Sequence, residues 1–125
     1  KLMPRAGMLA LDGSGVSRDA EVVAAYEADP LVNHGKVTAG LGIALFDAMD
    51  RVMTEAGSIT LPVLIMHGGA DTLAAPIGSE TFAAKVGATD FTLNVLPGLY
   101  HEIFNEPEGE EIIGQYADWI EARLP

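Results

Sequence analysis

Two side chains with catalytic chemistry follow two neighbouring apolar stretches of this sequence. Asp71 lies in HGGAD, directly after the apolar run LPVLIM, and His101 lies in GLYHEIFNE, after the next apolar stretch. A carboxylate that accepts the Nδ1 proton of a histidine fixes the tautomer of the ring and stabilises the imidazolium formed when the ring takes a proton. The pair is therefore a candidate acid and general base. The alternative is that Asp71 caps a turn or the following helix and that His101 is an ordinary loop histidine.

Two parallel strands are expected to position this pair. Residues 63–66 form a short, continuously apolar run, which is typical of a strand covered on both faces. Residues 91–96 predict a second strand, and residues 79–86 predict a helix between the two, which implies a right-handed parallel crossover. Functional groups of an open α/β sheet gather outside the carboxyl ends of its strands. Asp71 and His101 are thus expected at the same edge.

Three further helices are predicted around these strands, over residues 17–30, 38–57 and 109–124. Ser17 is the expected N-cap of the first helix, and Pro30 is expected to end it. The first 16 residues predict an irregular apolar segment because they contain several glycines and Pro4. Two strands do not make a stable sheet alone. The chain is therefore interpreted as an incomplete α/β domain.

Length and composition exclude several classes of function. The 125 residues suit about one domain, and the net charge of −11 leaves no basic stripe for nucleic acid. The acidic surface also disfavours electrostatic attraction to anionic lipid, though not hydrophobic contact with it. Without cysteine there is no disulfide and no thiolate nucleophile. No apolar stretch reaches the roughly 20 residues of a membrane span, and the compartment stays open between the cytoplasm and the envelope of a bacterium.

Three stretches together give the sequence a family resemblance. They are SRDAEVVAAYEADPLVNHGK, LPVLIMHGGAD and PGLYHEIFNEPE. With them, nearly the whole chain resembles the C-terminal half of bacterial monoacylglycerol lipases and lysophospholipase-like α/β-hydrolases. The resemblance implies an α/β fold that contains the last two parallel strands of the hydrolase sheet and their flanking helices. Residues 1–36 would then be a cap (lid) segment, and residues 37–125 the C-terminal part of the core.

The same resemblance implies a Ser-His-Asp esterase in which Asp71 and His101 are the triad acid and base. The expected substrate is a monoacylglycerol or a similar lipid ester, and neither a cofactor nor a metal is expected. The chain departs from the family because it has no G-x-S-x-G nucleophile elbow and no early oxyanion loop. Because the chain also starts with Lys1, we expect it to be part of a hydrolase divided within the cap. An N-terminal fragment of that hydrolase would carry the nucleophilic serine.

Other residues have weaker claims to a functional role. Met8, Leu9 and His34 are candidate substrate-binding residues of the cap. An apolar lid surface that touches lipid is an alternative to packing within the cap, and its members are Leu2, Met3, Met8, Leu9 and Leu11. His67 is either a turn histidine or, together with Asp71 and His101, part of a metal site. Glu102 and Glu106 either tune the pKa of His101 or, in the case of Glu106, begin the last helix.

Two alternative functions stay open at the level of sequence. A hydrolase that resembles haloalkane dehalogenases or epoxide hydrolases would use a carboxylate nucleophile at the elbow, which lies outside these residues. A non-catalytic assembly fragment of hydrolase ancestry is the other alternative. The presence of Asp71 and His101 at both matching positions argues weakly against a non-catalytic role.

Overall fold

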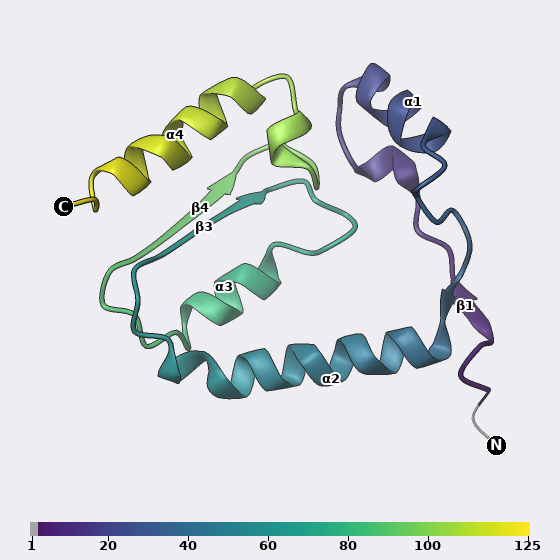
Figure 1. Cartoon of the computed structure of the whole chain (residues 1–125), viewed down its shortest axis with the longest axis horizontal. Coiled ribbons are helices and arrows are strands. Elements are labelled where there is room, and N and C mark those ends of the chain that lie inside the picture. The colour runs from purple at the N-terminus through teal and green to yellow at the C-terminus, as the bar shows by residue number, and fades with distance from the viewer. Residues whose placement is uncertain (1–2) are drawn as a thin grey trace.

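The computed structural model describes residues 3–125, and its centre is a parallel pair of strands (Figure 1). Strand β3 (Val63–Gly68) pairs in parallel with β4 (Phe91–Leu96). The bounds of β4 match the prediction, and β3 extends two residues beyond the predicted range because its backbone stays paired through the first glycine. A second, antiparallel pair joins β1 (Gly7–Leu9) to β2 (Val37–Thr38). The prediction of an irregular N-terminal segment was wrong there, because strands this short leave no periodic pattern.

Four α-helices surround these strands in the described part of the chain. They are α1 (Ala20–Ala28), α2 (Ala39–Glu55), α3 (Ile77–Ala83) and α4 (Gly109–Glu121). Figure 1 shows α3 and α4 on opposite sides of the β3–β4 pair. One-turn 3₁₀ helices cover Gly13–Gly15, Ala56–Ser58 and Ile103–Asn105. The crossover from β3 through α3 to β4 has the expected parallel arrangement.

The start of α1 differs from the prediction because a tertiary contact uses the expected cap. Asp19 caps α1 by accepting a hydrogen bond from the Glu21 amide at 2.8 Å. Ser17, the predicted cap, instead donates its hydroxyl to the Asn105 carbonyl at 2.9 Å. The last helix begins at Gly109, so Glu106 precedes it.

The described core lies between the sheet and α4. Met66 of β3 packs with Leu99, Ile103 and Ile112, and all four are buried. Trp119 of α4 donates its indole N–H to the Thr92 hydroxyl of β4 at 3.1 Å, and this hydrogen bond joins the helix to the strand. Ile113 and Ile120 of α4 are about half exposed, so they lie outside this core.

Helix α2 exposes an apolar surface in this chain. It contains no buried residue, and six of its large apolar side chains are about half exposed or more. They are Leu41, Ile43, Leu45, Phe46, Met49 and Val52. An exposed apolar stripe of this length is typical of a helix that packs against further protein. Among the described helices, none is both long and apolar enough to cross a membrane.

Candidate active site

Asp71 is a buried carboxylate held in the turn that follows β3. Its Oδ1 accepts hydrogen bonds from the amides of Leu73, at 2.8 Å, and Ala74, at 2.9 Å. The side chain is only 2% exposed. Because both amides bond Oδ1, the turn orients the carboxylate so that Oδ2 faces the neighbouring loop. The same two hydrogen bonds compensate for the burial of Oδ1.

His101 lies at the free oxygen of Asp71, on the loop that follows β4. Its Nδ1 is 2.8 Å from Asp71 Oδ2, within the range of a charge-assisted hydrogen bond. The carboxylate can only accept, so Nδ1 carries the proton and Nε2 of the neutral ring is a base. The side chain is 43% exposed, and the ring is therefore accessible to a substrate group.

Hydrogen bonding keeps Asp71 ionised despite its burial. Burial raises the pKa of the Asp71 carboxyl, but hydrogen bonds from the Ala74 amide, the His101 ring and the Leu73 amide together outweigh that effect. As a result, the pKa of the Asp71 carboxyl lies below the ordinary value of an aspartate. At neutral pH a negative charge is therefore available to stabilise an imidazolium at His101.

Backbone contacts lock the aspartate turn to the histidine loop. The Gly69 amide donates to the Leu96 carbonyl at 2.7 Å, and the Ala70 amide donates to the Leu99 carbonyl at 2.9 Å. The approach is so close that a Cβ atom on Gly68 would lie 1.9 Å from the Tyr100 carbonyl oxygen. The GG pair of HGGAD thus permits the contact that places Asp71 beside His101.

His67 supports the aspartate turn. Its Nε2 donates to the Ala74 carbonyl at 2.8 Å and lies 3.2 Å from Asp71 Oδ2, while Nδ1 is 2.7 Å from the Ser79 hydroxyl. This is the turn-histidine interpretation, since both ring nitrogens are used. Within residues 3–125, no group of three or more His, Cys, Asp or Glu side chains could hold a metal ion.

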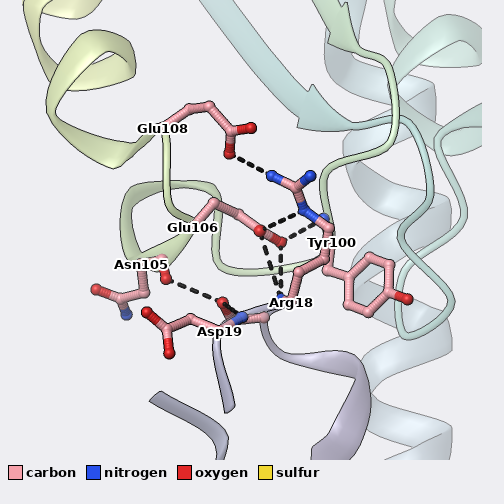
Figure 2. Close-up of polar contacts among 7 residues, drawn as sticks. Arg18, Asp19, Tyr100, Asn105, Glu106 and Glu108 are labelled. Carbon is pink, nitrogen blue, oxygen red and sulfur yellow. Dashed lines mark hydrogen bonds and ion pairs between the residues drawn. The ribbon is translucent and has the colours of Figure 1, made fainter. Parts of the chain in front are cut away.

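The two glutamates near His101 contact other groups. Glu102 accepts a hydrogen bond from the Asn105 side-chain amide at 2.7 Å. Glu106 is buried and accepts the Tyr100 amide at 2.7 Å (Figure 2). In the described part of the chain, neither carboxylate is hydrogen-bonded to the His101 ring. The prediction missed this contact of Glu106, and the only sequence signal for it was an acid soon after the histidine.

The candidate substrate-binding residues do not contact Asp71 or His101 through any described hydrogen bond. Met8 and Leu9 are exposed on β1, and Leu2 lies outside the described residues. His34 packs edge-on against Tyr26, with ring centres 5.8 Å apart, and borders a small cavity of about 100 Å³.

Three of the four serine hydroxyls have partners other than His101. Ser17 bonds Asn105, Ser58 donates to the Glu55 carbonyl at 2.7 Å, and Ser79 bonds His67. In residues 3–125 no serine hydroxyl is hydrogen-bonded to His101. The described residues thus pair a buried aspartate with a histidine and place no hydrogen-bonded serine hydroxyl beside that histidine.

Comparisons with known proteins find relatives that match nearly the whole chain. The family model described as "Serine aminopeptidase, S33" matches residues 1–108. A monoacylglycerol lipase of Mycolicibacterium smegmatis is 44% identical over 124 residues, which are 99% of this chain and 44% of that protein. A monoglyceride lipase of Rattus norvegicus is 30% identical over 98% of this chain and 41% of its own length.

A solved structure has the same fold. The crystal structure of the Paleococcus ferrophilus monoacylglycerol lipase superposes with a TM-score of 0.85 at 35% sequence identity, over 95% of this chain and 47% of that one. The chain therefore spans less than half the length of these relatives. The expected resemblance and fold class are confirmed. The chain belongs to the hydrolase family described as "Serine aminopeptidase, S33", and its parallel strands and flanking helices are part of an α/β-hydrolase fold.

Proposed function

We propose that the chain supplies the acid and the base of a carboxylic ester hydrolase that acts on monoacylglycerols or similar lipid esters. The observation that carries this proposal is the 2.8 Å hydrogen bond between His101 Nδ1 and the buried Asp71 carboxylate. It leaves a basic Nε2 on a ring that is 43% exposed. The substrate class is supported by the similarity to two lipases that act on monoacylglycerols.

The proposed reaction passes through an acyl-serine. A serine hydroxyl attacks the ester carbonyl carbon while Nε2 of His101 takes the hydroxyl proton. The bond to the alcohol then breaks, and Nε2 returns that proton to the leaving oxygen. Water attacks the acyl-serine while Nε2 of His101 takes a proton from it. The bond to the serine oxygen then breaks, Nε2 returns the proton to that oxygen, and the fatty acid is released. Asp71 accepts the Nδ1 proton throughout and stabilises each imidazolium.

We also propose that an N-terminal fragment of the same hydrolase supplies the nucleophilic serine and the oxyanion hole. Two observations support it. The chain spans 44% of the Mycolicibacterium relative, and the apolar side chains of α2 are exposed. In this proposal residues 1–36 belong to the cap, residues 37–125 belong to the core, and α2 packs against the companion fragment. The exposed Met8 and Leu9 favour contact of the cap with the lipid substrate or its surface.

The test uses the complete hydrolase, with the N-terminal part present. We expect hydrolysis of a monoacylglycerol, labelling of the N-terminal serine by a fluorophosphonate probe, and loss of both in His101→Ala. Substitution of exposed Glu121 by Gln is the matched control and should leave both unchanged. Hydrolysis without probe labelling would instead indicate a carboxylate nucleophile. Activity that survives His101→Ala would contradict the proposal, and so would a lone folded 13.1 kDa chain with full activity.

A further inference from the structure

A second buried carboxylate, Glu106, lies behind the loop that carries His101. Its side chain has no exposed surface. Oε1 accepts the amide of Tyr100, the residue before His101, at 2.7 Å. Oε2 accepts Arg18 Nε at 2.7 Å, and the Arg18 amide lies 3.3 and 3.4 Å from the two oxygens. Figure 2 shows these contacts converging on the one carboxylate.

Arg18 comes from a segment far away in the sequence, just before α1. That segment lies along the histidine loop, because the His101 amide donates to the Gly15 carbonyl at 3.4 Å and the Glu102 amide donates to the Val16 carbonyl at 2.8 Å. The guanidinium of Arg18 also pairs with the more exposed carboxylate of Glu108. The histidine loop is thus enclosed between residues 15–18 and Glu106.

The hydrogen bonds around Glu106 suit a carboxylate better than a neutral amide. A buried carboxylate is costly unless donors satisfy both oxygens, and here each oxygen has one short hydrogen bond. A glutamine has only one acceptor oxygen, so either Tyr100 N–H or Arg18 Nε–H would face its amide nitrogen. Glu106 is three residues before the start of α4, and its side chain does not cap that helix. The side chain instead bonds the histidine loop through the Tyr100 amide and the segment before α1 through Arg18.

We propose that Glu106 is a positioning residue, which fixes the backbone before His101 so that the ring stays on Asp71, and that Arg18 holds Glu106 in place. The proposal rests on the proposed function, since the geometry of His101 affects turnover only if His101 is the base. Misplacement of a reacting group by about 1 Å can cost on the order of 100-fold in rate. We therefore expect Glu106 to act on the chemical step more than on substrate binding.

The experiment compares Glu106→Gln, Glu106→Ala and Arg18→Met in the complete hydrolase. Glu108→Gln is the control, because it removes a partner of Arg18 without touching the histidine loop. For Glu106→Gln we expect kcat to fall by about 10- to 100-fold with KM within about twofold. We also expect faster hydrogen exchange at the Tyr100 amide and loss or broadening of the low-field proton signal of His101 Nδ1–H. Arg18→Met should give a smaller change, because Glu106 still accepts the Tyr100 amide.

The nuclear magnetic resonance measurements separate this inference from the proposed function. If the wild-type protein hydrolyses no ester, the proposed function fails, and the Tyr100 and His101 signals alone decide whether Glu106 positions the loop. Unchanged signals and unchanged kcat in Glu106→Gln would overturn the inference. Equal effects in Glu108→Gln would overturn it too, because they would assign the change to surface charge. Because Glu106→Gln is nearly isosteric, the test does not depend on the folding of Glu106→Ala.

Discussion

His101 Nδ1 lies 2.8 Å from Asp71 Oδ2 although thirty residues separate them in the sequence. Two parallel strands produce this contact because both residues follow the carboxyl ends of neighbouring strands. The carboxylate is buried and oriented by two amides, whereas the ring is accessible. This combination is what a histidine base requires, since its tautomer is fixed on one side and its second nitrogen is free on the other.

Asp71→Asn should disable the base while preserving the turn. The asparagine carbonyl can still accept the Leu73 and Ala74 amides, but its NH₂ group would then face Nδ1 and favour the wrong tautomer of His101. We expect kcat for monoacylglycerol hydrolysis by the complete enzyme to fall by about 10³- to 10⁴-fold. Asp90→Asn is the matched control, since Asp90 pairs with Arg123 away from the site. A loss of less than tenfold in Asp71→Asn would contradict the assigned role.

The lowered pKa of Asp71 predicts how stability changes with pH. An unfolded aspartate titrates near pH 3.9, and the folded pKa lies below that value. The folded state therefore binds fewer protons, so the contribution of Asp71 to stability is fully present above about pH 4 to 5 and is lost as the pH falls through the folded pKa. Urea unfolding at a series of pH values should show a wild-type advantage over Asp71→Asn that shrinks below pH 4. An advantage that grows on acidification would contradict this sign.

Part of this site was predictable because its signals are local. The apolar runs before Asp71 and His101 are short and end in glycine or proline, and the strands formed at 63–68 and 91–96. The cap of α1 was not predictable in the same way. Ser17 and Asp19 both suit an N-cap, and the contact of Ser17 with Asn105, 88 positions away, decides between them.

Glu106 was beyond sequence reasoning for a similar reason. Its partners are the Tyr100 amide, which carries no side-chain signal, and Arg18, which is distant in the sequence. The expectation that it tunes His101 or starts the last helix relied on neighbouring positions alone. Only the folded chain brings residues 15–18 against the histidine loop.

Gly68→Ala should damage the site through the backbone. The added Cβ would lie 1.9 Å from the Tyr100 carbonyl oxygen, so the histidine loop must move away from β3. We expect a loss of about 1–3 kcal/mol or more in the free energy of unfolding, together with a large loss of kcat. Gly114→Ala is the control because it lies exposed within α4 with nothing within 4 Å of the new Cβ. It should stabilise the protein by about 0.5–1 kcal/mol. Equal effects of the two substitutions would contradict the proposed close packing.

The contacts of His67 predict that metal removal has no effect. Nδ1 lies beside the Ser79 hydroxyl and Nε2 beside the Ala74 carbonyl, so a metal ion would have to break one of these bonds. We expect dialysis of the complete enzyme against EDTA, followed by assay with and without Zn²⁺, to leave kcat within about twofold, because no step in the proposed acyl-serine route uses a metal. Stoichiometric zinc in the purified protein, with activity that EDTA abolishes and zinc restores, would contradict this prediction.

The exposed apolar side chains of β1 lead to a prediction about lipid substrates. Met8 is 69% and Leu9 61% exposed, which leaves both available to contact an acyl chain. Burial of such a side chain stabilises a complex by about 1.5–3 kcal/mol when complete, so the partial loss in Met8→Ser/Leu9→Ser should raise KM for a long-chain monoacylglycerol by about tenfold. A water-soluble acetate ester reaches the same base without a long acyl chain, and its kcat/KM should stay within about twofold. The two assays together separate lipid contact from damage to the site. Equal losses on both esters would mean that β1 supports the fold, and unchanged kinetics on both would mean that β1 does not contact the substrate.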